Sequence, residues 1–169
     1  MIGSMAAVIR SCIRVMCVDD HPIIRQGLSA VLASDPQLKL VAQVATAENA
    51  IDAFRRVQPD VTLMDLHLPC MTGVEAIIAI RREFPDALIL VMATEVDDGQ
   101  IQRALAAGAR GYLHKGMPMI DLLAVIHDVV EESKDVERET NAHHEPLLAR
   151  TTPVDNLVWT TCPRYSEAA

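Results

Sequence analysis

Three aspartates and one lysine stand directly after apolar runs of the sequence, and these residue types are suited to phosphoryl chemistry. Asp19 and Asp20 close one run, Asp65 closes a second and Lys115 closes a third. A carboxylate beside a buried strand loses hydration unless a cation or a hydrogen-bond donor replaces it. The combination therefore predicts a site that holds a divalent metal and handles a phosphoryl group.

Mg²⁺ fits such a site because it takes hard oxygen ligands in near-octahedral geometry. Asp20 and Asp65, on adjacent strands, are the predicted direct ligands, and Asp19 acts directly or through water. With its charge partly masked by the metal, Asp65 could attack phosphorus and form an acyl phosphate. Lys115 would then balance the charge on the phosphoryl oxygens as a compact cation.

Each of these residues also has a simpler interpretation when it is taken alone. Asp19 or Asp20 could cap a helix that begins near Pro22, Asp65 could start a loop, and Lys115 could be a solvated surface lysine. The joint arrangement, with every residue at a strand end, favours one shared site.

The histidines and cysteines give weaker signals. His21 and His67 are predicted to be ordinary loop residues, since neither has a partner at metal-ligand spacing. His143 and His144 with Cys162 could bind zinc, but no ligand-pair spacing supports that reading. The four cysteines show no CxxC spacing and are typical of reduced thiols in a cytoplasmic protein.

Composition and charge exclude several classes of protein. The 169 residues are 50% hydrophobic and carry a net charge of −8, which argues against direct nucleic-acid binding by this chain. No stretch approaches the uncharged apolar length that a bilayer requires, so we expect no membrane segment. A single well-buried domain is expected from this length.

Short apolar runs alternate with helical patterns over residues 13–133. The strand-like runs are 13–18, 39–45, 60–64, 87–92 and 110–114, and none has a clean polar face. Such runs are typical of parallel strands covered by helices on both sides. The pattern predicts a doubly wound α/β fold, in which the carboxyl ends of the strands form the binding crevice.

The sequence divides into three predicted parts. Residues 1–12 form an N-terminal extension, residues 13–133 form the folded domain, and residues 134–169 form a linker or mobile tail. The tail begins with densely charged residues that could extend the last helix, and later prolines break any long element. It contains no pair of amphipathic helices around a turn and no basic cluster, so no recognisable DNA-binding domain is expected there.

Three motifs in residues 13–133 resemble the receiver domain of bacterial two-component response regulators. They are Val18-Asp19-Asp20-His21-Pro22, the run Met64-Asp65-Leu66-His67-Leu68-Pro69-Cys70-Met71-Thr72-Gly73, and the run Ala106-Ala107-Gly108-Ala109-Arg110-Gly111-Tyr112-Leu113-His114-Lys115. The first and third resemble in particular the subfamily that carries a C-terminal LuxR-type helix-turn-helix output domain.

The resemblance implies a flavodoxin-like, five-stranded parallel sheet of order 2-1-3-4-5. It implies phosphotransfer from a sensor histidine kinase to Asp65, with Mg²⁺ held by Asp20, Asp65 and the main-chain carbonyl of His67. It also implies a signalling face on the fourth helix, fifth strand and fifth helix, which includes Tyr112 and can mediate homodimers. The expected function is a cytoplasmic response regulator, with transcriptional control as output. Such a domain is not an enzyme beyond its own phosphorylation and dephosphorylation.

One position departs from the family pattern. The family places Ser or Thr at the end of the fourth strand, where the hydroxyl swings toward the phosphoryl group, whereas this sequence has Ala93 followed by Thr94. Alternate strand residues point to opposite faces, so Thr94 should not reach the phosphoryl group. We therefore expect that Asp65 can be phosphorylated while coupling to the signalling face is weakened.

Two rival functions stay open at this point. A haloacid-dehalogenase-like phosphatase also uses an aspartyl nucleophile, but it needs an acid two residues later, where this chain has His67. A phosphorylation-independent interaction module would keep the fold and use its helical face constitutively, which Ala93 favours.

Overall fold

Strands and helices alternate throughout the computed structural model, which describes residues 12–94 and 98–142. The elements are β1 (Ile13–Val18), α1 (Pro22–Ala33), β2 (Leu38–Val44), α2 (Ala47–Val57), β3 (Val61–Asp65), α3 (Gly73–Glu83), β4 (Ile89–Ala93), α4 (Asp98–Ala106), β5 (Gly111–His114) and α5 (Met119–Ala142). The five predicted strands are thus present, and their ends differ from the prediction by no more than a few residues.

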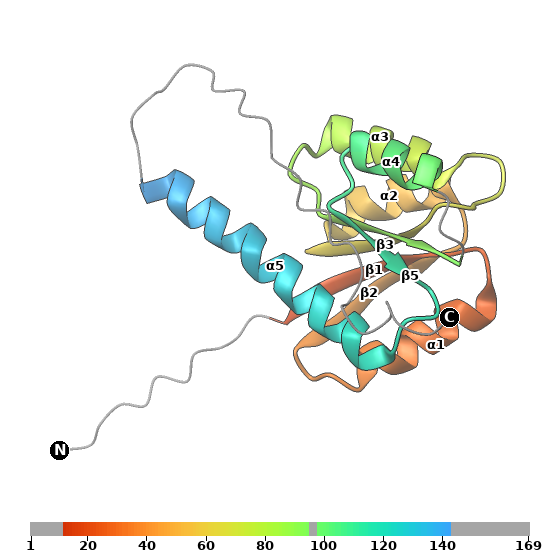
Figure 1. Ribbon diagram of the computed structural model, residues 1–169, viewed down its shortest axis with the longest axis horizontal. Helices are drawn as coiled ribbons and strands as arrows, with labels where there is room; N and C mark the ends of the chain where they lie inside the picture. The colour runs from red at the N-terminus through yellow and green to blue at the C-terminus, as the bar shows by residue number, and fades with distance from the viewer. Residues whose placement is uncertain (1–11, 95–97, 143–169) are drawn as a thin grey trace, which may run out of the picture.

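The strands form one parallel sheet in the order β2-β1-β3-β4-β5. Helices α1 and α5 lie on one face of the sheet, and α2, α3 and α4 lie on the other (Figure 1). The chain steps outward from β1 to β2 and then returns to place β3 on the opposite side of β1. The strand order therefore reverses between β1 and β3, and the carboxyl ends of these two strands are the place where such a sheet favours ligand binding. The predicted fold class and strand order are confirmed.

Two hydrophobic cores, one on each face, hold the sheet in place. On the α1 and α5 side, Val15 and Leu63 pack with Ile126 of α5. On the other side, Met16 and Met64 pack with Ile77 of α3. Because successive strand residues serve opposite faces, the central strands β3 and β4 are buried at every position, and the edge strand β2 carries the exposed polar residues Lys39 and Gln43.

Cys17 of β1 is fully buried close to the strand end. Burial, followed by the nearby charge of Asp19, raises the pKa of its thiol to about 12. The thiolate is the nucleophilic form of cysteine, so this thiol is inert at neutral pH and fills the core as a small apolar group.

Helix α5 is the longest element of the fold, with 24 residues. It packs on the sheet beside α1 through Leu122, Ile126 and Val129 and then extends beyond the sheet (Figure 1). The predicted domain boundary at residue 133 falls inside this helix, which continues to Ala142. The three-part division stays a prediction, and His143, His144 and Cys162, for which no ligand-pair spacing supports a zinc site, lie outside the described residues. None of the helices in the described ranges combines the length and apolar character needed to cross a bilayer.

Candidate functional site

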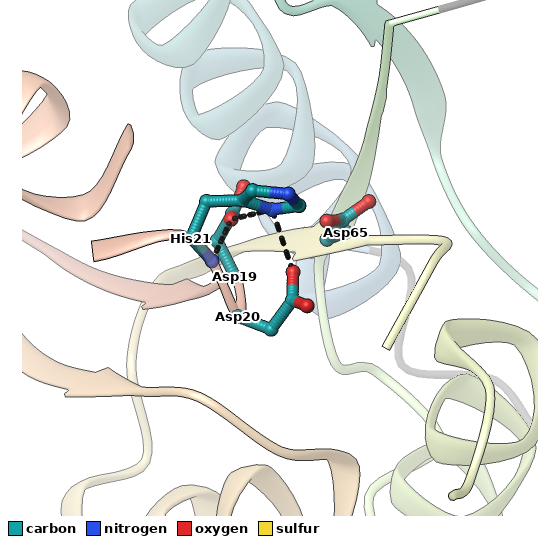
Figure 2. A group of neighbouring side chains, drawn as sticks. All are labelled: Asp19, Asp20, His21 and Asp65. Atoms are coloured by element: carbon teal, nitrogen blue, oxygen red, sulfur yellow. Dashed lines mark hydrogen bonds and ion pairs between the residues drawn. The ribbon is translucent and has the colours of Figure 1, made fainter. Parts of the chain in front are cut away.

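The predicted acidic residues meet at the carboxyl end of the sheet. Asp19 and Asp20 follow β1, and Asp65 is the last residue of the neighbouring β3. Figure 2 shows these three side chains together with His21. Each of the four residues offers one ligand atom, and these atoms lie within 4.8 Å of one another. The strand order brings together residues that are more than 40 positions apart in the sequence, as expected from topology.

Lys115, directly after β5, is the cation of this cluster. Its Nζ lies 2.6 Å from Asp19 Oδ2 and 2.7 Å from Asp65 Oδ2, and its side chain is only 7% exposed. Burial by itself lowers the pKa of this ammonium group, but the hydrogen bonds and charges of Asp19 and Asp65 outweigh burial and raise it. Reading Lys115 as a solvated surface lysine is therefore wrong.

The second oxygen of each buried carboxylate is held by the backbone. Asp19 Oδ1 accepts the amide of His21 at 2.8 Å, and Asp65 Oδ1 accepts the amide of His67 at 3.0 Å. These bonds shape the two loops that follow β1 and β3. The interpretation of Asp19 or Asp20 as a helix cap is wrong, because the N-cap residue of α1 is His21 and no side chain caps this end.

Two residues of the site were not predicted from the sequence. His21 Nδ1 lies 2.7 Å from Asp20 Oδ1 and 3.3 Å from Asp19 Oδ1, so the ring is more than an ordinary loop residue. Arg25 Nη1 donates to the main-chain carbonyl of Asp19 at 2.6 Å and fixes the end of β1. The position of His21 directly after the aspartate pair was the available signal, but no spacing rule points to Arg25.

Gly73 allows α3 to begin close to the site. Its amide donates to the carbonyl of Leu66 at 3.1 Å. A Cβ at this position would overlap the main-chain carbonyl oxygen of Asp65, so only glycine fits without a backbone shift. The helix is started by a reciprocal capping box between Thr72 and Glu75. The loop after Asp65 is therefore short and held at both ends.

The three predicted switch residues lie beyond the acidic cluster. Ala93 is the buried last residue of β4, and Thr94 follows it as an exposed residue. Tyr112 lies on β5 and packs on the α4 side of the sheet, where its hydroxyl is buried without a hydrogen-bond partner among the described residues. Burial raises the pKa of Tyr112. A switch role for these residues stays a prediction.

Comparison with known proteins assigns the family. Residues 15–127 match the response regulator receiver domain, and the chain belongs to this family. It is 34% identical over 119 residues to the transcriptional regulatory protein DegU of Brevibacillus brevis, covering 70% of this chain and 50% of that protein. It is 35% identical over 114 residues to the response regulator GacA of Pseudomonas viridiflava, covering 68% of this chain and 53% of that protein. The chain thus spans about half the length of these curated relatives.

Solved structures agree with this assignment. A two-component response regulator of the LuxR family from Aurantimonas sp. SI85-9A1 superposes with a TM-score of 0.69 at 32% identity, over 79% of this chain and all of that one. The receiver domain of the response regulator NarL from Mycobacterium tuberculosis gives a TM-score of 0.69 at 25% identity, over 72% of this chain and 98% of that one. The class of protein is therefore a receiver domain with relatives among LuxR-family response regulators.

Proposed function

We propose that this chain is the phosphoacceptor part of a response regulator, which receives a phosphoryl group on Asp65 from a sensor histidine kinase. The bridge made by Lys115 between Asp19 and Asp65 is the observation that carries the proposal. It places a nucleophilic carboxylate and a buried cation within 2.7 Å of each other, next to a further carboxylate. Members of this family use that combination for phosphoryl transfer, and the bulk of the chain supplies only the scaffold.

The donor set fits Mg²⁺, because carboxylate oxygens from two loops converge within the distance that one small cation spans. Asp19, Asp20 and Asp65 would hold the ion with the main-chain carbonyl of His67, and its charge would offset that of the phosphoryl oxygens. An oxygen of Asp65 forms the new bond to phosphorus while the bond to the donor atom breaks. Lys115 then moves from the carboxylates to the phosphoryl oxygens.

Incubation of the protein with acetyl phosphate and Mg²⁺ tests this proposal. We expect one acid-labile phosphoryl group per chain, mapped to Asp65 by mass spectrometry of the peptides. Sustained turnover of a phosphomonoester would instead support the phosphatase alternative. Absence of labelling would contradict the proposal and support an interaction module that works without phosphorylation.

An apolar surface beside the site supports a protein as phosphodonor. A recess of about 190 Å³ lies between α1 and the start of α5, with Leu28, Met117 and Lys115 in its lining. Ile23 and Ile120 stand beside this region with 76% and 75% of their surface exposed. A kinase that docks here would hold its phosphohistidine within reach of Asp65.

Beyond the receiver itself, we propose a cytoplasmic location, transcriptional control as output and homodimers through the face of α4, β5 and α5, with no direct DNA contact by this chain.

The absent hydroxyl at position 93 favours weak coupling between phosphorylation and the signalling face. We expect the Ala93→Thr variant to show a larger conformational response to acetyl phosphate than the wild type, because a threonine hydroxyl can bond to the phosphoryl group. The response is measured as chemical-shift changes of α4 and β5 by NMR, at equal phosphorylation of both proteins. Equal responses of the two proteins would refute the weakened coupling. Partner binding that is unchanged in the Asp65→Asn variant would favour the interaction module.

His21 is expected to compete with the metal for Asp20. The His21→Ala variant should bind Mg²⁺ more tightly, since Asp20 Oδ1 no longer has an imidazole at 2.7 Å. Loss of one such partly exposed ionic contact is worth up to about 1 kcal/mol, which corresponds to roughly a fivefold change in affinity. Titration calorimetry with MgCl₂ measures the affinity of both proteins for Mg²⁺. His67→Ala is the matched control, because it removes an exposed histidine from the other loop of the site. Weaker Mg²⁺ binding by His21→Ala would contradict the prediction and show that the His21 ring supports the metal site.

A further inference from the structure

His114, the residue before Lys115, joins two segments of the chain beside the site. It ends β5, where it pairs with Ala93 at the end of β4. Its Nε2 lies 2.9 Å from the main-chain carbonyl oxygen of Thr94. Its Nδ1 accepts the amide of Gly116 at 3.0 Å, within the turn that carries Lys115. One imidazole therefore contacts both the end of β4 and the Lys115 turn.

These two contacts define the state of the ring. An amide can only donate, so Nδ1 must be the unprotonated nitrogen that accepts from Gly116. A main-chain carbonyl can only accept, so the proton of the neutral imidazole lies on Nε2 and is donated to Thr94. Both polar atoms of the ring are used by backbone groups from different segments. This arrangement is specific for histidine, since an aliphatic side chain supplies neither bond.

Gly116 is shaped to accept the ring. A Cβ on Gly116 would lie 2.9 Å from His114 Cε1 and 3.0 Å from His114 Nδ1, which is closer than side-chain carbons approach one another. A side chain at position 116 would therefore require the imidazole to shift, and glycine leaves room for the ring in its present place. The backbone adds a parallel link, because the amide of Lys115 donates to the carbonyl of Ala93 at 2.8 Å.

We propose that His114 is a positioning residue that ties the end of β4 to the Lys115 turn and relays movement of Lys115 to Thr94 and α4. The inference rests on the proposed function, in which Lys115 changes its contacts when Asp65 is phosphorylated. The two hydrogen bonds of the His114 ring do not involve the side chain at position 93, where the alanine has no hydroxyl. His114 thus supplies, from the neighbouring strand β5, a polar connection between the site and Thr94 at the end of β4.

Three variants separate the two bonds of the ring. His114→Leu removes both, His114→Asn places an acceptor near the position of Nδ1, and His114→Gln places a donor near the position of Nε2. Without any phosphodonor, we expect amide exchange at Gly116 to accelerate about fivefold in the Leu and Gln variants, but not in the Asn variant. The imidazole ¹⁵N spectrum of the wild type should show the proton on Nε2.

The relay itself is measured after phosphorylation by acetyl phosphate. We expect the chemical-shift response of Thr94 and α4 to be lost in His114→Leu and His114→Asn and to be retained in His114→Gln. A proton on Nδ1, unchanged Gly116 exchange in His114→Leu, or a wild-type response of Thr94 in that variant would each overturn the proposal. The ring measurements need no phosphate on Asp65, so a failure of the proposed function, seen as absent labelling, is distinguished from a failure of the relay.

Discussion

The Asp65→Asn variant is expected to take up no covalent phosphate from acetyl phosphate, with labelling reduced more than about a thousandfold, because its amide is not a nucleophile. The substitution keeps the size of the side chain and removes one of the three negative charges gathered at the site. The fold should therefore remain intact. Intact-protein mass spectrometry after incubation with acetyl phosphate and Mg²⁺ measures the incorporation.

A matched control separates loss of the nucleophile from loss of charge. Asp52 lies on α2 with its side chain 68% exposed and forms an ion pair with Arg55 of the same helix. Asp52→Asn removes the same charge from a remote surface and should leave phosphate incorporation unchanged. Full labelling of Asp65→Asn would show that another residue accepts the phosphoryl group, which would contradict the assignment of the site.

The Lys115→Met variant should lose about 3 kcal/mol of unfolding free energy at neutral pH, because removal of one partner leaves buried carboxylates without their cation. Asp19 is fully buried and Asp65 is 1% exposed, so water replaces little of the lost interaction. The folded pKa of Lys115 is raised, so its stabilising effect is complete below the unfolded pKa and is lost only as the pH rises through the folded value. Urea unfolding at pH 7 therefore measures the whole effect.

Three comparisons test the cause of this destabilisation. Arg110→Met breaks the exposed pair of Arg110 and Glu132, with a nitrogen–oxygen distance of 3.3 Å, and should cost less than about 1 kcal/mol. The double variant Asp19→Asn with Lys115→Met should lose less stability than the sum of the two single variants, because the lysine then leaves behind fewer charges. Added Mg²⁺ should reduce the difference in unfolding free energy between Lys115→Met and the wild type. If Lys115→Met loses no more stability than Arg110→Met, water and not Lys115 compensates the charge of the buried carboxylates.

The fold could be predicted because its signals are global. Five apolar runs separated by helical patterns leave few arrangements other than a parallel sheet, and the carboxyl ends of such strands share one edge. The exact strand ends were less accessible, because hydrophobicity alone does not fix them. The fourth apolar run begins at Ala87, yet β4 begins at Ile89, since the amide of Ala87 is held by the carbonyl of Phe84 in a turn.

The site was predicted in its charged members but not in its supporting contacts. Asp19, Asp20, Asp65 and Lys115 stand out because charge at the end of a buried strand is costly. His21, Arg25 and His114 act through a few contacts with carboxylate or main-chain groups, and such contacts follow no periodicity. Their roles depend on which loops come to lie side by side, and this information enters only with the three-dimensional arrangement.

Helix α5 continues past the hydrophobic core and can act as a lever. Its last described core residue is Val130, and the backbone continues as a helix to Ala142. Twelve further residues at 1.5 Å each place the helix end about 18 Å beyond that anchor. A tilt of ten degrees at the base would displace the tip by roughly 3 Å, the scale on which helix packing distinguishes one partner arrangement from another. Small adjustments beneath α5 are thereby magnified before they reach residue 142.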